Sequence, residues 1–319
     1  MSTPAVSFSS SAEFLKKVRP KQFFDGLFSA TNTRFDNRTQ ESFRPCSVTC
    51  RTIPDTLGSC VVKHGANYIV STVVGSLSRK TSITSKFDSL IAVNVQYSSQ
   101  THPQFENAQM ERDRRILFIS SFLESLIGQC IDESSLSLQN IPLKNRKSPL
   151  SLLAWSLTVD ITILEEDGDP TDAAVLSCFM GLKSVKFPEL FVSENPHTRS
   201  FSISPVQPEN EIGRIAPAHL EFITLPICVT FGIVNTVKGI LLLADPSEEE
   251  LTLPASTIRF VIDILREQPR FLMLEKDAGI PLDFSKEIHL KPKDIFSPSP
   301  LALDVALGRA KSLWKATPL

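Results

Sequence analysis

Four aspartates lie close together near the middle of the chain: Asp160, Asp167, Asp169 and Asp172. Divalent cations bind several carboxylate oxygens that converge on one point, and a strand, a turn and a helix can bring such oxygens together. Simpler roles account for most of them, because Asp167 precedes a glycine in a turn and Asp169 and Asp172 suit a helix start. The sequence therefore predicts no metal site, and a divalent-metal enzyme using the Asp160–Asp172 cluster stays as an alternative.

The sequence contains no recognisable motif for nucleophilic catalysis or for phosphate binding. The sequence lacks the G-x-S-x-G and H-E-x-x-H patterns, and nothing pairs its five histidines with a nucleophile. It also lacks the G-x-x-x-x-G-K-[ST] and G-x-G-x-x-G loops that hold phosphates on backbone N–H groups. Cys46 and Cys50 lie four residues apart in a predicted strand, where they share a face and are interpreted as packing residues. No cofactor is predicted.

Composition limits the classes of protein that fit. The 319 residues carry 33 Lys and Arg against 35 Asp and Glu, a formal net charge of −2, and 42% are hydrophobic. These values argue against a disordered chain and against a protein that grips nucleic acid by charge alone. No apolar run approaches the ~20 residues that span a bilayer, and the N-terminus does not resemble a secretory signal. We therefore expect an intracellular protein without a membrane contact.

Hydrophobic periodicity predicts two rounds of several strands followed by a helix. The clearest strand is Ala154–Leu164, with Trp155, Leu157, Val159, Ile161 and Ile163 on one face. Further strands are predicted at Ser47–Thr52, Ser59–His64, Asn67–Val74, Leu90–Val95, Glu221–Val234, Gly239–Ala244 and within Leu251–Leu274. Helices are predicted at Ser10–Phe28 with an interruption at Pro20, at Gln109–Gln129, at Ala173–Leu182 and at Leu301–Trp314.

Five segments follow from this pattern. They are an N-terminal extension with a helix (1–33), a first half (34–192), a loop (193–219), a second half (220–280), and a linker with a C-terminal helix (281–319). Ser193–Arg214 within them is polar and is predicted to be a loop or a weak hairpin. The residues after Gly168 predict the start of a helix, with Asp169 as N-cap, Pro170 at the first helical position and Asp172 at the capping-box position.

Several segments resemble motifs of the ribonuclease PH superfamily. Arg34-Phe-Asp-Asn-Arg38 with Arg44-Pro45 resembles its R-x-D-G-R … R-P motif, and Gly58–Asn67 resembles its G-S-A-x-V-x-x-G-N strand pair. Leu153–Pro188 is similar to the long strand, turn and helix of its first half. Leu243–Glu250 resembles the D-P-T-x-E-E element of ring subunits that lack activity, and Val18–Phe24 resembles the N-terminal helix of one eukaryotic exosome ring subunit.

The resemblance implies an α+β (mixed α/β) fold of two similar β-α halves with mixed sheets, plus an N-terminal helix. It also implies a ring subunit of the RNA exosome, which supports 3′-to-5′ RNA processing and decay by threading RNA to other subunits. The implied partners are other ribonuclease PH-like ring subunits, cap proteins with S1 or KH domains, and RNA in the assembled channel. The implied locations are the nucleus, including the nucleolus, and the cytoplasm.

Departures from the family pattern imply that the chain is not an enzyme. Active members begin the helix after the long strand with G-T-R, which holds the attacking phosphate, whereas this chain has Asp169-Pro170-Thr171-Asp172. Active members also carry a catalytic aspartate early in the second half, where this chain has Leu225-Pro226. Asn37 stands where the family motif has a glycine, and this difference affects only the expected conformation of a local turn. The alternative is an active phosphate-dependent 3′-to-5′ exoribonuclease with relocated groups.

Two groups of basic residues are candidates for the RNA path. Arg79 and Lys80 lie in a predicted loop without acids, and Arg112, Arg114 and Arg115 lie at the start of a predicted helix. RNA that passes through a channel needs cations that bind phosphates regardless of sequence. Solvated charges or salt bridges between subunits are the alternative explanation for both groups.

Overall fold

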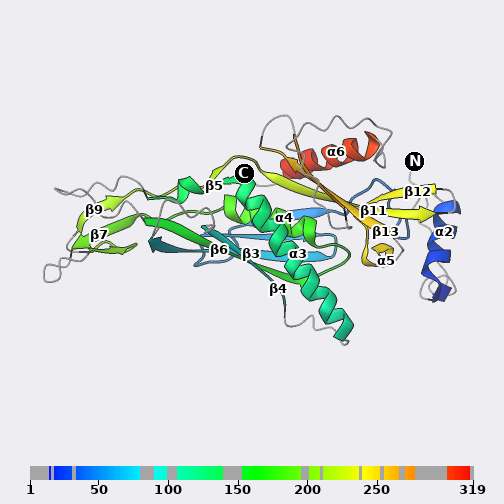
Figure 1. The fold of residues 1–319 in the computed structure, drawn as a ribbon, viewed down its shortest axis with the longest axis horizontal. Helices are drawn as coiled ribbons and strands as arrows, with labels where there is room; N and C mark the ends of the chain where they lie inside the picture. The colour runs from blue at the N-terminus through cyan, green and yellow to red at the C-terminus, as the bar shows by residue number, and fades with distance from the viewer. Residues whose placement is uncertain are drawn as a thin grey trace.

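The computed structural model describes residues 14–15, 18–30, 34–79, 90–98, 106–138, 153–194, 201–208, 211–236, 239–251, 255–265, 270–276 and 300–316. Two larger sheets and two small ones, with helices between and around them, make up this part of the chain (Figure 1). The predicted mixed α/β fold is confirmed. Among the helices described, none combines the length and the apolar character that crossing a bilayer requires.

The first sheet has the strand order β1-β2-β3-β6-β4. Its strands are β1 (Cys46–Cys50), β2 (Gly58–His64), β3 (Asn67–Arg79), β6 (Leu153–Glu165) and β4 (Ile91–Tyr97). Neighbouring strands are antiparallel except β4 and β6, which run parallel, so the sheet is mixed. β6 has the predicted alternation, because its side chains from Trp155 to Ile163 are buried at every second position and partly exposed between.

The second sheet has the order β12-β11-β13-β14 and is antiparallel throughout. Its strands are β12 (Gly239–Ala244), β11 (Pro226–Thr236), β13 (Ala255–Asp263) and β14 (Arg270–Lys276). The predicted strands at Glu221–Val234 and Leu251–Leu274 are each divided, the first into β10 (Glu221–Phe222) and β11, and the second into a helical turn, α5 (Glu248–Leu251), followed by β13 and β14.

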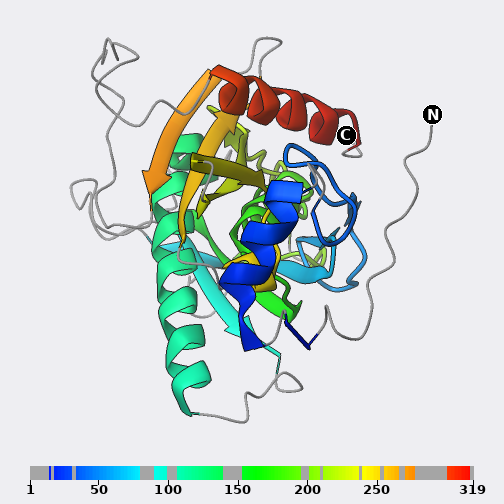
Figure 2. The same cartoon turned by 90° about the vertical axis from the view of Figure 1, so that its right-hand side faces the viewer.

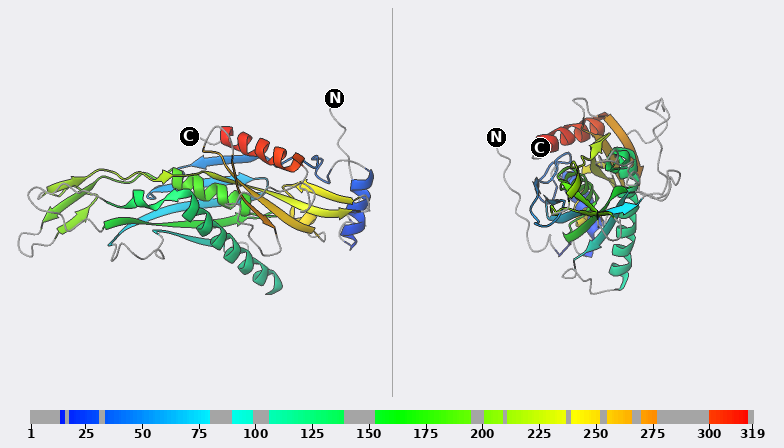
Figure 3. Two further views of the ribbon diagram at one scale, coloured as in Figure 1. Left: turned by 45° about the horizontal axis from the view of Figure 1, so that its top comes forward. Right: turned by 90° about the vertical axis from the view of Figure 1, so that its left-hand side faces the viewer.

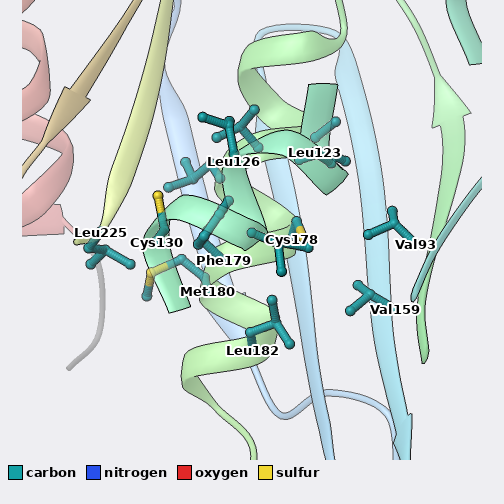
Figure 4. Packing of buried hydrophobic residues seen from close by; sticks show 14 of the residues in the cluster. Val93, Leu123, Leu126, Cys130, Val159, Cys178, Phe179, Met180, Leu182 and Leu225 are labelled. Atoms are coloured by element: carbon teal, nitrogen blue, oxygen red, sulfur yellow. The ribbon is translucent and has the colours of Figure 1, made fainter. Parts of the chain in front are cut away.

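Helix α4 (Thr171–Lys183) lies between the two larger sheets and packs against β2, β3 and β11. Every residue from Thr171 to Leu182 is buried, as expected of a helix that is covered on all sides. Helix α3 (Glu106–Cys130) packs against β4 and α4. Figure 4 shows Phe179 and Met180 of α4 beside Leu126 and Cys130 of α3, within one continuous core. The helix whose start carries the candidate site is thus the most buried one described.

The prediction of a loop at residues 193–219 was wrong, because much of the described part of this segment forms strands. The segment contains β8 (Phe201–Ser204) and β9 (Glu211–Ile215), which flank β7 (Leu190–Glu194) in a three-stranded antiparallel sheet at one end of the molecule (Figure 1). The strands β8 and β9 are only four and five residues long, and pairing with β7 satisfies their backbone groups. The other alternative given for Ser193–Arg214, a weak hairpin, is closer to the observed strands.

The N-terminal helix α2 (Pro20–Ala30) begins at the proline that was predicted to interrupt it. Proline suits the first position of a helix, because a helix start leaves that N–H unpaired in any case. Phe23, Phe24 and Phe28 are buried against Val234 and Leu243 of the second sheet. Figure 3 shows α2 at the end opposite the three-stranded sheet, and Figure 2 shows the C-terminal helix α6 (Pro300–Ala316) lying over the second sheet.

Buried arginine–carboxylate pairs join the two halves of the molecule. Arg34 donates from Nε to Glu250 Oε1 at 2.9 Å, and its Nη2 contacts the other carboxylate oxygen. Arg44 donates from Nε and Nη2 to the Asp245 carboxylate at 2.8 and 2.6 Å. The arginines belong to the R-x-D-N-R … R-P segment and the acids to the D-P-S-E-E-E segment. Two of the segments that resemble superfamily motifs therefore bind each other.

Asn37 lies in a hydrogen-bonded turn between Arg34 and Arg38. Asn37 has a φ of 65°, in the left-handed region that asparagine tolerates better than most residues. The Arg34 N–H donates to the Arg38 carbonyl at 2.8 Å across the turn. The substitution is therefore accommodated locally.

Asp245→Asn should destabilise the protein by about 3 kcal/mol near neutral pH, because it removes the buried carboxylate that binds Arg44 and leaves the guanidinium with only the more exposed Asp167 as an acidic partner. Burial opposes ionisation of Asp245, but hydrogen bonds from Arg44 and His64 hold its pKa well below the ordinary 3.8. A carboxyl with a lowered folded-state pKa stabilises fully above its unfolded pKa and progressively less below it. The difference between wild type and variant should therefore shrink as the pH falls below about 4.

Urea unfolding between pH 7 and pH 3 measures this difference. Asp36→Asn is the matched control, because Asp36 pairs with Arg38 at a 43% exposed site and should change stability by less than about 1 kcal/mol. Equal effects of the two substitutions at pH 7 would contradict the assignment of the stabilisation to the buried pair.

Candidate functional site

The start of α4 is occupied by the protein's own carboxylate. The helix begins at Thr171, and Pro170 is its N-cap residue without a side-chain cap. Asp169 Oδ1 accepts a hydrogen bond from the Thr171 N–H at 2.9 Å and another from the Thr171 hydroxyl at 2.5 Å. Asp169 therefore satisfies a free N–H of the helix start as predicted, although it lies one residue further from the helix than predicted.

Asp172 does not form a capping box, and this part of the prediction was wrong. Because the helix starts at Thr171, Asp172 is the second helical residue. The N-cap Pro170 has no N–H that could donate a hydrogen bond to the Asp172 carboxylate. Its carboxylate instead accepts from the Thr230 N–H at 2.9 Å and from the Thr230 hydroxyl at 2.7 Å on β11. Burial, followed by the charge of Asp169, raises the pKa of Asp172. Asp172 thus joins α4 to the second sheet.

The arginine that faces Asp169 comes from the second half. Arg259 of β13 donates to Asp169 Oδ2 from Nε at 2.9 Å and from Nη2 at 2.6 Å, and both side chains are about nine-tenths buried. Burial alone would raise the pKa of Asp169, but Arg259 and the Thr171 donors lower it. The Arg259 guanidinium also lies 4.8 Å from the ring centre of Phe118. A charged pair therefore fills the space at the helix start.

A cavity of about 320 Å³ opens beside this pair. Arg114, Arg115 and Phe118 of α3, the start of α4 and Arg259 of β13 form its walls. Two of the predicted RNA-path arginines thus share one cavity with Asp169 and Thr171 of the predicted phosphate site. Glu111 and Asp169 add acidic groups to the same walls. The cavity therefore combines three guanidinium groups with two carboxylates.

The three arginines of α3 have different surroundings. Arg112 donates from Nε to Glu166 Oε1 at 3.3 Å and lies 4.9 Å from the ring centre of Tyr97. Arg115 donates to Glu166 Oε2 at 3.4 Å, and the Tyr97 hydroxyl donates to the same oxygen at 2.6 Å. The Arg114 side chain is exposed. Arg112 and Arg115 therefore support the fold through Glu166, while Arg114 faces solvent at the cavity wall.

The remaining predicted positions lie elsewhere. Leu225 and Pro226 are buried at the start of β11, and the Leu225 N–H donates to Asp263 Oδ1 at 2.9 Å. Asp263 of β13 also accepts from the Leu265 N–H at 2.9 Å, so this buried carboxylate binds backbone groups where two strands end. Arg79 is the last residue of β3, and Lys80 lies outside the described residues.

The aspartates of the Asp160–Asp172 cluster have separate partners. Asp160 accepts from the Asn94 amide at 2.9 Å on the exposed face of the first sheet, and Asp167 accepts from Arg44 at 2.7 Å. Asp169 and Asp172 bind Arg259 and Thr230, as described above. Within the described ranges, no three His, Cys, Asp or Glu side chains gather as metal ligands do. The observed arrangement thus uses these carboxylates in structural contacts.

Arg259 is the site residue that the sequence reasoning missed. It interrupts the apolar run Ile258–Ile262, and a charged residue in such a run is rarely buried unless it is paired. This charged residue within an apolar run was the sequence signal from which a buried ion pair could have been predicted. The identity of its partner was not visible, because Asp169 is 90 residues away along the chain.

Comparison with known proteins identifies relatives of this fold. Residues 42–188, just under half of the chain, match the family described as the 3′ exoribonuclease family, domain 1. Exosome complex component RRP45 of Danio rerio is 26% identical over 225 residues, covering 68% of this chain and 49% of that protein. The chain thus spans about half the length of this relative. The rrp45 component of Schizosaccharomyces pombe is 23% identical, covering 89% and 84%, and Rrp42 of Archaeoglobus fulgidus is 24% identical, covering 79% and 83%.

Solved structures share the architecture. A chain of an archaeal exosome core superposes with a TM-score of 0.61 at 21% identity, covering 96% of this chain and 98% of that one. A chain of the Archaeoglobus fulgidus exosome with RNA bound to the active site gives a TM-score of 0.60 at 21% identity, covering 94% and 98%. The chain therefore has the ribonuclease PH-like fold, with mixed sheets.

Asp169→Asn should lower the free energy of unfolding by about 3 kcal/mol, because it removes the nearer acidic partner of the buried Arg259 guanidinium and leaves Glu275, at 3.8 Å, as the other. Asp160→Asn is the matched control and should change stability by no more than about 0.5 kcal/mol, since Asp160 binds a neutral amide on a partly exposed face. Chemical denaturation at pH 7 measures both. A loss as small for Asp169→Asn as for the control would show that the Arg259 pair contributes little.

Proposed function

We propose that this chain is a non-catalytic subunit of an exosome-type ring, which helps to thread RNA to nucleases carried by other chains. The observation that carries the proposal is the pairing of Asp169 with Arg259 at the start of α4. The exosome names of the relatives and the ribonuclease PH-like fold support the assembly. The proposal extends to partners, namely other ring subunits of this fold and S1 or KH cap proteins.

The geometry at the α4 start supports the lack of activity. Phosphoryl transfer to inorganic phosphate depends on positive groups and N–H donors that are positioned for the developing charge. Here Pro170 has no N–H, and the Thr171 N–H already donates to Asp169. The Arg259 guanidinium is already paired with the same carboxylate. A phosphate at this place would meet the negative charge of Asp169 and would have to displace it from Arg259.

The subunit identity and the location are further parts of the proposal. The resemblance of Val18–Phe24 to an N-terminal helix favours the subunit called ribosomal RNA-processing protein 43, whereas the relatives described above carry the names RRP45 and Rrp42. The buried contacts of Phe23 and Phe24 show that this helix is part of the fold. We propose the nucleus, including the nucleolus, and the cytoplasm as locations.

The isolated chain should release no nucleoside diphosphates from RNA in the presence of inorganic phosphate, and it should be recovered from cells together with ring partners of the same fold. Phosphate-dependent release is followed by chromatography, and an active phosphorolytic exoribonuclease under the same conditions is the control. Robust turnover by the chain would favour the alternative of an active exoribonuclease. Recovery as a free monomer would contradict ring membership.

Arg114→Ala should weaken RNA binding by the assembled ring, because Arg114 is the exposed arginine of the α3 group at the cavity wall. The slope of log affinity against log salt should become less steep by about 0.7 for each RNA phosphate that the ring no longer neutralises. Arg214→Ala is the matched control, since Arg214 is an exposed arginine on the three-stranded sheet and pairs with Glu211. Equal slopes for wild type and Arg114→Ala would remove Arg114 from the RNA path.

A further inference from the structure

Two thiols face each other across the first pair of strands. Cys50 is the last residue of β1, and its partner in the antiparallel register is Cys60 on β2. The two Sγ atoms are 3.9 Å apart. Cys60 is fully buried, whereas Cys50 is half-buried and therefore open to a small reagent.

The register places this pair where a disulfide can close. The Arg51 N–H donates to the Ser59 carbonyl at 2.7 Å, so the neighbouring pair is hydrogen-bonded and Cys50–Cys60 is a non-hydrogen-bonded pair. Directly opposed residues of that type have Cα atoms about 4.5 Å apart, within the range of about 4.4–6.8 Å that disulfides bridge.

The surroundings also activate one of the two sulfurs. A hydrogen bond from Cys60 lowers the pKa of Cys50 to about 7, and the charges of Arg51 and Lys183 act in the same direction while burial opposes them. By contrast, its hydrogen bond to Cys50, followed by burial, raises the pKa of Cys60. Cys50, which is half-buried and has the lowered pKa, is therefore the sulfur that reacts first, and the buried Cys60 is the one that reacts in a second step.

We propose that Cys50 and Cys60 form a reversible oxidation site that closes to a cross-strand disulfide with hydrogen peroxide as the oxidant. The Cys50 thiolate attacks one oxygen of the peroxide, so that an S–O bond forms, the O–O bond breaks and the departing hydroxide becomes water. Cys60 then attacks the Cys50 sulfur, the S–O bond breaks, and the proton of Cys60 leaves with the oxygen as a second water. Two thiols lose two electrons, and one peroxide becomes two waters.

The bond would fix an edge of the first sheet. β1 is an edge strand of that sheet and pairs with β2. Its far end, at Cys46, lies opposite His64 rather than a thiol. Oxidation therefore ties the Cys50 end of β1 to the sheet and leaves the Cys46 end unchanged, and a thiol reductant restores the open state.

Peptide mapping of the oxidised full-length chain tests the proposal. The reduced protein is treated with one equivalent of hydrogen peroxide, its remaining thiols are alkylated, and it is digested with trypsin. Cleavage after Arg51 separates residues 39–51, which contain Cys46 and Cys50, from residues 52–63, which contain Cys60. The expected product is the disulfide-linked pair of these two peptides, formed in most molecules and lost on reduction.

Variants identify the sulfurs involved. Cys46→Ser should retain the linked peptides, whereas Cys50→Ser, at a half-buried position that tolerates a hydroxyl, should abolish them. Cys60→Ala should also abolish them, and it should move the midpoint of Cys50 alkylation to higher pH, because Cys50 loses its hydrogen-bond donor. The proposal is wrong if the link survives Cys50→Ser, if it is lost in Cys46→Ser, or if peroxide yields only sulfinic acid at Cys50 or bonds between molecules.

Discussion

Buried carboxylates must be matched by arginines or N–H donors, and this requirement determines how the two halves of the chain are joined. Removing such charges from water costs several kcal/mol per ion, so an unmatched one would destabilise the fold. Asp245 is matched by Arg44, and Arg44 in turn holds Asp167 beside the turn that precedes α4. Arg309 of α6 donates to the Arg44 carbonyl at 2.9 Å, so the C-terminal helix is attached to the same group.

The same requirement governs the candidate site. Asp169 lies at the start of a helix that is buried on all sides, where a carboxylate without a partner would not persist. Arg259 from the second half and the Thr171 N–H supply that partner. The interactions that fill the site therefore also hold the first half to the second. A single substitution at Asp169 would both open the site and weaken the contact between the halves.

Local patterns in the sequence predicted most elements correctly, whereas contacts between distant elements stayed hidden. The alternation in β6 and the turn at Gly168 are local, and both appear in the structure as predicted. The role of Asp172 was misjudged because its partner, Thr230, is 58 residues away and a nearby cap was the only visible explanation. Arg259 was missed for the same reason. The resemblance of two segments to superfamily motifs did not reveal that they bind each other, which only the fold shows.

The pairing of Asp169 with Arg259 at the start of α4 is consistent with the proposed lack of activity. A phosphate-binding helix start needs an anion to balance its N–H groups and any neighbouring arginine, and an enzyme obtains that anion from its substrate. In this chain Asp169 supplies the anion, so Arg259 is already paired beside the cavity. An anion that belongs to the chain itself suits a subunit whose proposed role is to hold its place in an assembly. In the proposed assembly, exposed cations such as Arg114 are the ones that we expect RNA to contact.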